Sequence, residues 1–181
     1  FSPANFELSI GNTTSTDLSD ACSKKDPVSL DLGPEEPSHV LMQGRIDRLD
    51  ATEDGKFMVI DYKTGATNPS HKDIASGLSF QLPVYIRCIE TCFPGMQGIA
   101  GSYYIVKSDG ELSKKIVFGD KNYLDLFESL GRSQGINEDY QAVISSSLNT
   151  IKKYIQNMRR GIFHPTVLIG KCPSYCDYKT V

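Results

Sequence analysis

The feature that most constrains how this sequence can fold is a pair of charged residues at the end of a strand-like run. Asp61 and Lys63 close the run Val-Ile-Asp-Tyr-Lys at 59–63, and side chains two apart in a strand point to the same face of a sheet. A carboxylate and an ammonium group are therefore predicted side by side. Taken alone, the two residues favour an exposed ion pair on an edge strand, a common arrangement that contributes little to stability, and only the flanking motifs reverse that preference.

Asp47 supplies a second carboxylate on what we expect to be the neighbouring strand. It ends an apolar run that begins at His39, and a Glu-Asp-Gly turn signal at 53–55 separates it from Asp61. Strands that pair antiparallel about such a turn form a hairpin, which brings the two carboxylates nearly opposite each other. Two oxygen ligands beside a lysine suit Mg²⁺, which binds few carboxylates and keeps several of its waters.

A helix is expected after the second of these strands. Asp73 is its predicted N-cap, and the apolar residues that follow recur every three or four positions. Because Pro83 lies within this pattern, the helix either begins near Phe80 or bends there. Gln81 and Tyr85 are four residues apart, so they share a helix face that is able to turn toward the carboxylates.

Short alternating segments predict the rest of a sheet, and a longer periodic segment predicts a second helix. The strands are expected at 1–11, 28–32, 98–107 and 113–118, and the helix at 139–160. A tail at 161–181 follows this helix and contains Cys172 and Cys176. Cys88 and Cys92 are four apart on the first helix and are interpreted as buried structural thiols, since free cysteine packs as a small hydrophobe.

Length and composition indicate a single globular domain. The chain has 181 residues, of which 39% are hydrophobic and 23% charged, and no apolar run is long enough to span a bilayer. It begins with Phe rather than Met, so we expect a piece of a larger protein. Five cysteines without a secretory signal favour a reducing, cytoplasmic compartment. The net charge of −3 disfavours binding of nucleic acid by bulk electrostatics alone.

Taken together, these motifs resemble those of the RecB-like branch of the PD-(D/E)XK nucleases, and within it the nuclease domain of AddB-type helicase-nuclease subunits. That family carries Gly-x-Ile-Asp, Asp-Tyr-Lys-[Ser/Thr]-Gly and Gln-x-x-x-Tyr, which are found here at 44–47, at 61–65, and as Gln81 with Tyr85. The resemblance implies an α/β restriction-endonuclease-like fold over residues 1–181, in which α-helices flank a mixed central β-sheet.

The resemblance also implies a Mg²⁺- or Mn²⁺-dependent DNA exonuclease that acts in double-strand-break repair and recombination. Asp47, Asp61 and the backbone carbonyl of Tyr62 would hold the metal, and Lys63 would orient the attacking water or stabilise charge on the phosphate. Gln81 and Tyr85 would contact the water, the phosphate or a base. The implied partners are single-stranded DNA and a helicase region or partner subunit, and no membrane is involved.

In related nucleases with an iron-sulfur cluster, one early cysteine and three near the C-terminus hold the cluster. By this resemblance Cys172 and Cys176 are the remnant of such a site. Because four thiolates are the usual requirement, an intact cluster is not expected in this chain, although the full-length protein would hold one.

Two other functions remain open. The acidic charge favours a non-catalytic module of the same fold that binds nucleic acid or a partner, and a CRISPR-associated RecB-like nuclease is the second alternative. Arg45 and Arg48 are interpreted as basic side chains on a solvated face, with DNA contact as the alternative role.

Overall fold

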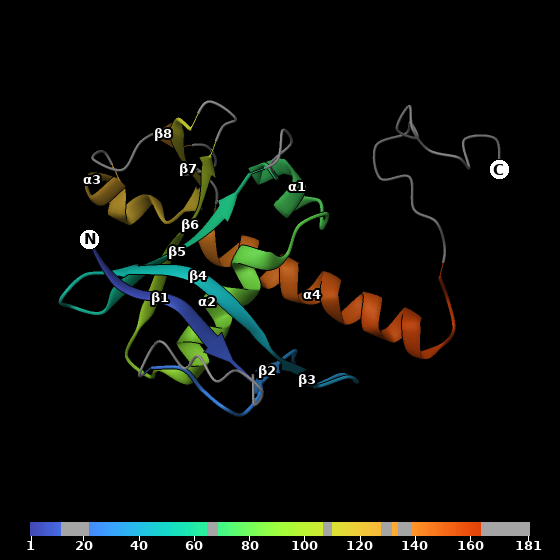
Figure 1. Ribbon diagram of the computed structural model, residues 1–181. Helices are drawn as coiled ribbons and strands as arrows, with labels where there is room; N and C mark the ends of the chain where they lie inside the picture. Colours follow the sequence, from blue (N-terminus) through green and yellow to red (C-terminus); the bar gives the residue numbers. More distant parts are fainter. Residues whose placement is uncertain (12–21, 65–68, 107–109, 128–131, 134–138, 164–181) are drawn as a thin grey trace, which may run out of the picture.

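A mixed β-sheet of six strands forms the centre of the structure (Figure 1). The computed structural model describes residues 1–11, 22–64, 69–106, 110–127, 132–133 and 139–163. Across the sheet the strands lie in the order β1 (Ser2–Ile10), β4 (Gly44–Ala51), β5 (Lys56–Lys63), β6 (Gln97–Val106), β7 (Leu112–Gly119) and β8 (Arg132–Ser133). Two short strands, β2 (Val28–Asp31) and β3 (His39–Met42), pair separately.

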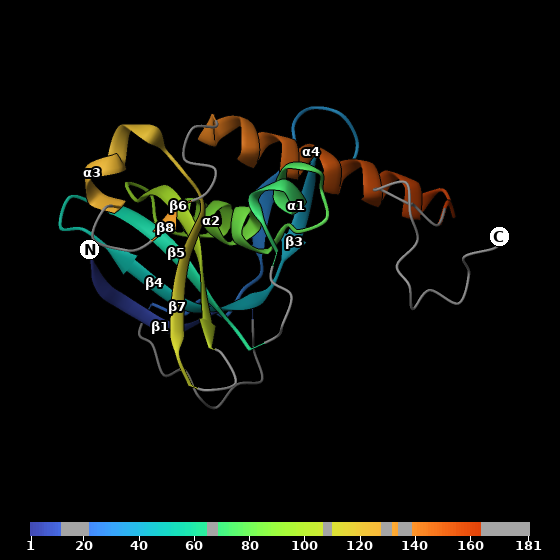
Figure 2. The same cartoon turned by 90° about the horizontal axis from the view of Figure 1, so that it is seen from above.

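Helices cover both faces of the large sheet. On one face α2 (Gln81–Cys92) and α4 (Tyr140–Arg159) pack on Phe57, Val59 and Tyr103, and we call this the α2 face. On the other, the 3-10 helix η1 (Lys121–Tyr123) and α3 (Leu124–Phe127) pack on Met58 and Ile60, and we call this the α3 face. Figures 1 and 2 show α2 and α4 on the same side of the sheet. The predicted restriction-endonuclease-like α/β fold is confirmed.

The predicted hairpin that carries the two aspartates is confirmed, although the apolar run before Asp47 is not part of it. β4 and β5 pair antiparallel from Ala51↔Phe57 to Arg48↔Ile60, and Gly55 in the turn has φ +83°. The run at His39–Met42 instead forms β3, which pairs with β2 in the small sheet. Gln43 separates the two strands. Asp47 therefore lies within the strand that follows the apolar run, and not at the end of that run.

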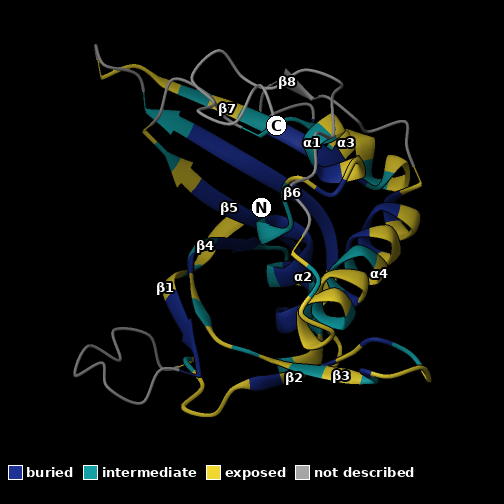
Figure 3. Ribbon diagram, turned by 90° about the vertical axis from the view of Figure 1, so that its right-hand side faces the viewer, coloured by how far each residue is buried: buried dark blue, intermediate teal, exposed yellow. Residues whose placement is uncertain are grey.

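β5 is a central strand, so the interpretation of Asp61 and Lys63 as an exposed pair on an edge strand is wrong. It pairs with β4 on one side and runs parallel to β6 on the other. Parallel neighbours require a crossover connection, and α1 (His71–Ala75) and α2 provide it. Figure 3 shows both β5 and β6 as largely buried. The apolar residues of β5 are accordingly continuous rather than alternating.

The helix predicted after Asp73 is two helices. Ser70, not Asp73, caps α1, because the Ser70 side chain accepts a hydrogen bond from the Asp73 backbone N–H while the Asp73 carboxylate binds the Ser70 N–H in return. This capping box lowers the pKa of Asp73. α2 then begins at Gln81 after Phe80, the first of the two predicted alternatives. Pro83 is its third residue, where a missing N–H leaves no helical hydrogen bond unmade.

Close contact between α2 and β6 fixes where α2 begins. A Cβ added to Gly101 of β6 would lie 2.6 Å from the Phe118 ring and 3.2 Å from Leu82 Cβ, and Phe118 and Leu82 are both fully buried. We expect Gly101→Ala to lower the free energy of unfolding by about 1–3 kcal/mol, because neither neighbour has room to move. Urea denaturation measures this change. Gly110→Ala is the comparison variant, because its new Cβ has nothing within 4 Å and any loss of stability there comes from the positive φ of the backbone and not from crowding. Equal stability of Gly101→Ala and the wild type would contradict the prediction.

None of the helices in the described part of the chain is long and apolar enough to cross a membrane. Cys172 and Cys176 lie outside the described residues, as does most of the predicted tail. Cys88 is buried as predicted, and burial raises the pKa of its thiol to about 12. A thiol with so high a pKa stays protonated at neutral pH, which agrees with a structural role.

Candidate active site

Asp61 and Lys63 form a close ion pair at the C-terminal end of β5. Lys63 Nζ lies 2.6 Å from Asp61 Oδ2, and the Asp61 side chain is 4% exposed whereas that of Lys63 is 28% exposed. The ammonium also lies over the Tyr103 ring, 5.4 Å from its centroid. Apart from this ammonium, Asp61 Oδ2 has no hydrogen-bond partner among the described residues. A carboxylate oxygen is able to accept more than one ligand, so a cation could bind Oδ2 beside the ammonium or in its place.

Gln81, the first residue of α2, bridges the two charged side chains. Its Nε2 donates to Asp61 Oδ1 at 2.6 Å, and its Oε1 accepts from Lys63 Nζ at 2.8 Å. The carboxylate on one side and the ammonium on the other determine which way the amide points. The crossover from β5 places the start of α2 over the end of β5, so Gln81 arrives at the site from a separate element.

Asp47 approaches the same point from β4. The β4–β5 ladder ends at Arg48↔Ile60, and one step further the Asp47 Oδ2 accepts a hydrogen bond of 2.9 Å from the Tyr62 N–H. Asp47 and Asp61 thus lie on adjacent strands near one another, as predicted.

The pKa of Asp61 is raised above its ordinary value of 3.8. Burial is the largest cause, and the negative charge of Asp47 adds to it, whereas the hydrogen bond and charge of Lys63 act in the opposite direction. Two carboxylates in a partly desolvated place repel each other. A bound cation would relieve that repulsion, which makes the pair suited to hold one.

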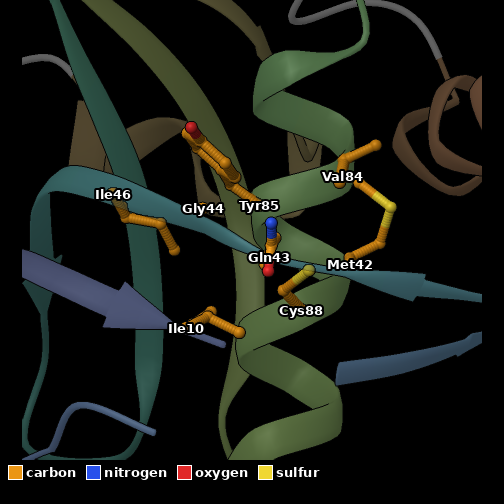
Figure 4. A pocket seen from close by; sticks show the side chains of 8 residues that line it. All are labelled: Ile10, Met42, Gln43, Gly44, Ile46, Val84, Tyr85 and Cys88. Atoms are coloured by element: carbon orange, nitrogen blue, oxygen red, sulfur yellow. The ribbon is translucent and has the colours of Figure 1, made fainter. Parts of the chain in front are cut away.

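Tyr85 joins the site through Gln81 and packs against the glycine of the first motif. Its hydroxyl lies 3.4 Å from Gln81 Nε2, and a Cβ added to Gly44 would lie 3.4 Å from the Tyr85 ring. The ring therefore rests directly against the start of β4. Below it is a cavity of about 10 Å³ lined by Ile10, Met42, Gln43, Gly44, Ile46, Val84, Tyr85 and Cys88 (Figure 4). This volume holds at most about one water, so the cavity is no nucleotide site.

Two features of the site were not predicted from the sequence. Tyr103 lies beside Asp61 in the parallel register of β5 and β6. The sequence would have indicated this pairing only if the crossover connection between the two strands had been recognised. Arg48 was interpreted as solvated, which is wrong, because its side chain is 19% exposed and pairs with the buried Asp50. Arg45 is exposed as interpreted, with 61% of its side chain accessible.

The residues present fit a divalent cation with few protein ligands. Asp47 and Asp61 offer carboxylate oxygens, and the backbone carbonyl of Tyr62, the residue that follows Asp61, is a further oxygen donor. The described residues contain no group of three or more His, Cys, Asp or Glu side chains able to hold a metal. Such a sparse donor set suits Mg²⁺ or Mn²⁺ that retains waters and substrate oxygens, and it does not suit a closed structural site.

Comparison with known proteins gives consistent matches. The family model of the PD-(D/E)XK nuclease superfamily matches residues 1–181. Two similar proteins are each named as a subunit of an ATP-dependent helicase/deoxyribonuclease. The one from Symbiobacterium thermophilum is 39% identical over 87 residues, or 44% of this chain. The one from Moorella thermoacetica is 38% identical over 80 residues, or 42% of this chain. The match spans only 7% of the length of each relative.

Proposed function

Because the chain belongs to the PD-(D/E)XK nuclease superfamily, we propose that it is a metal-dependent DNA exonuclease domain that hydrolyses phosphodiester bonds. The names of its relatives, which combine a helicase with a deoxyribonuclease, support DNA as the substrate. They also support a helicase region or partner subunit. We further propose that this helicase delivers single-stranded DNA to the domain during double-strand-break repair and recombination. A cytoplasmic location agrees with this role.

The observation that carries the proposal is the arrangement around Asp61. A buried carboxylate with a raised pKa has a second carboxylate nearby, and among the described residues its Oδ2 contacts only a lysine, at 2.6 Å, which a cation is able to replace. The charge of Asp47 disfavours the ionised form of Asp61, which is a cost to an Asp61–Lys63 pair, whereas a divalent cation is better held by two carboxylates than by one. The arrangement is therefore better explained by metal binding than by stability.

Each residue has a role that follows from its position. Asp47, Asp61 and the Tyr62 carbonyl would hold Mg²⁺ or Mn²⁺, which when bound polarises the scissile phosphate and lowers the pKa of a bound water. With a cation bound to the Asp61 carboxylate, Lys63 would be free to contact the phosphate or the attacking water in place of Asp61. Its ammonium then stabilises the negative charge that develops on the phosphate.

Gln81 and Tyr85 would hold the Asp61 carboxylate in place while Lys63 changes its contact. When Lys63 turns away, Gln81 still binds Asp61 Oδ1, so the carboxylate keeps its orientation while Oδ2 remains available. Gln81 Oε1 is then able to accept a hydrogen bond from the attacking water. Tyr85 supports Gln81 from one helical turn away, and its hydroxyl is able to donate to a substrate phosphate.

A binding module without catalytic activity is the second candidate. It is favoured by the net charge of −3 and by the presence of only two acidic residues at the site among those described. In that case Lys63 would stay paired with Asp61 permanently. A CRISPR-associated nuclease of the same branch differs in substrate rather than in site, so a substrate comparison separates it.

Calorimetric titration with Mn²⁺, combined with cleavage assays, tests the proposal. The full chain should bind Mn²⁺, and Asp47→Asn should weaken that binding by about tenfold or more through the loss of a charged ligand. With Mg²⁺ present, linear single-stranded DNA should be degraded from an end while a circular form survives. Mn²⁺ binding that does not depend on Asp47, together with intact DNA, would favour the non-catalytic module, and preferential cleavage of RNA would contradict the DNA assignment.

A further inference from the structure

Arg48 occupies a position on the α3 face that the proposed mechanism does not use. Its Nε and Nη2 donate to Asp50 Oδ1 and Oδ2 at 2.6 and 2.8 Å, a two-pronged contact with a carboxylate that is only 4% exposed. The guanidinium lies over the rings of Phe6 and Tyr104, 5.4 and 5.5 Å from their centroids. These contacts hold Arg48 in one orientation and satisfy its charge, so it is poorly suited to bind a phosphate.

The one remaining guanidinium nitrogen points toward β5. Arg48 Nη1 donates to the Tyr62 hydroxyl at 3.4 Å, and the Tyr62 ring packs edge-to-face on Tyr104, with centroids 5.8 Å apart. Arg48 and Tyr62 are diagonal neighbours across the β4–β5 pair, since Arg48 lies directly opposite Ile60. Arg48 therefore orients the ring of Tyr62 from the side of the sheet that faces away from Gln81.

Tyr62 links β4 to β5 beyond the end of their ladder. The ladder stops at the Arg48↔Ile60 pair, and two hydrogen bonds that involve Tyr62 join the strands further on. Its backbone N–H binds Asp47 Oδ2 at 2.9 Å, and its side chain binds Arg48. The peptide units on either side of Tyr62 connect it to Asp61 and Lys63, so a shift of Tyr62 moves both of them.

We propose that Arg48 is a positioning residue for the metal site, and that it acts through Tyr62. By holding the Tyr62 side chain, it fixes the N–H that orients Asp47 and the carbonyl that is a proposed metal ligand. The Gly-Arg-Ile-Asp-Arg-Leu-Asp motif at 44–50 then supplies a ligand in Asp47 and its support in the Arg48–Asp50 pair. This inference rests on the proposed function, because it assigns a role to residues around the same site.

Removal of the Tyr62 hydroxyl tests the link with little effect on folding, since the ring is partly exposed and its hydroxyl has few partners. We expect Tyr62→Phe to weaken Mn²⁺ binding roughly three- to tenfold, the range for loss of one hydrogen bond. Arg48→Lys keeps the charge opposite Asp50 but loses the two-pronged contact, and should weaken binding by about tenfold. The double variant should be no weaker than Arg48→Lys, because both substitutions break the same contact.

A second measurement distinguishes positioning from general destabilisation. Hydrogen exchange at the Tyr62 amide should speed up in Arg48→Lys, while exchange at the Ile105 amide on the neighbouring strand β6 stays unchanged. Arg87→Lys is the matched control, because Arg87 forms a 2.9 Å ion pair with Glu90 on α2, and it should leave both Mn²⁺ affinity and Tyr62 exchange as in the wild type.

The outcomes separate this inference from the proposed function. If the wild type binds Mn²⁺ through Asp61 but Tyr62→Phe and Arg48→Lys bind it equally well, the positioning role is overturned and the nuclease proposal stands. If the wild type binds no Mn²⁺, both are overturned. Faster exchange in Arg48→Lys throughout the sheet, in step with its loss of stability, would also overturn the positioning role, because a residue that only supports the fold would give that result.

Discussion

Replacement of Asp61 by Asn should abolish cleavage while making the metal-free protein more stable. The loss of a charged metal ligand is expected to lower the cleavage rate by at least about 10³-fold, since metal-ion catalysis supplies several kcal/mol of transition-state stabilisation. The amide keeps the shape of the carboxylate and remains within reach of Gln81, which lies 2.6 Å from Asp61 Oδ1 in the wild type. The variant should therefore fold.

The gain in stability follows from the raised pKa of Asp61. Because the folded state holds the Asp61 proton more tightly than the unfolded chain does, ionised Asp61 lowers the free energy of unfolding when the pH is above its folded-state pKa. Asn carries no charge and avoids this cost. The advantage of Asp61→Asn should accordingly be largest at neutral pH, should shrink as the pH falls through the raised pKa, and should vanish below the ordinary value of 3.8.

Thermal unfolding without metal measures this advantage, and cleavage of labelled single-stranded DNA measures the activity. Asp54→Asn is the control, because Asp54 lies in the turn at the other end of the same hairpin with 71% of its side chain exposed. It should cleave DNA like the wild type. An Asp61→Asn variant that retains cleavage would remove Asp61 from the proposed mechanism, and one that is less stable than the wild type at neutral pH would show that the Lys63 ion pair outweighs burial.

The sequence predicted how Asp47, Asp61 and Lys63 lie relative to one another better than it predicted the elements around them. Alternation placed Asp61 and Lys63 on one face, and the turn at 53–55 paired them with Asp47, because both rules depend only on local geometry. The fold class followed from the same motifs. The separation of α1 from α2 was not predicted, since the capping box at Ser70 and Asp73 becomes evident only when the helix is seen to end at Ala75.

Long-range contacts were the part that sequence patterns did not indicate. Arg48 looks like any surface arginine in the sequence, yet the strand order places it against Phe6 of β1 and Tyr104 of β6. Likewise, Gly44 is only part of a family motif in the sequence, whereas the structure shows that the Tyr85 ring packs against it, 3.4 Å from where a Cβ would lie. Both roles depend on which strands and helices become neighbours, and hydrophobic periodicity carries no information about that.

Lys63→Met should separate metal binding from catalysis. In the metal-free protein the Lys63 ammonium lies 2.6 Å from the Asp61 oxygen that a cation would approach, so the lysine and the metal compete for the same carboxylate. Removal of that charge is expected to raise Mn²⁺ affinity by roughly tenfold at mildly alkaline pH, a modest share of the Coulomb energy at this distance. The cleavage rate should nevertheless fall by about 10²–10³-fold, because the charge that stabilises the phosphate is lost.

The pH dependence of Mn²⁺ binding is a second, independent test of this prediction. Lys63 lowers the pKa of Asp61, so its removal should raise that pKa further, and protons should compete with Mn²⁺ up to a higher pH than in the wild type. The gain in affinity should therefore shrink, and then reverse, as the solution is made more acidic.

Lys56→Met is the control, because it removes a lysine paired with Asp54 at 3.6 Å in the distant turn. It should change neither the Mn²⁺ affinity nor the pH dependence of that affinity. Lower Mn²⁺ affinity in Lys63→Met at alkaline pH would mean that the lysine supports the metal site instead of competing with it, and the exchange of Lys63 from carboxylate to phosphate would have to be abandoned.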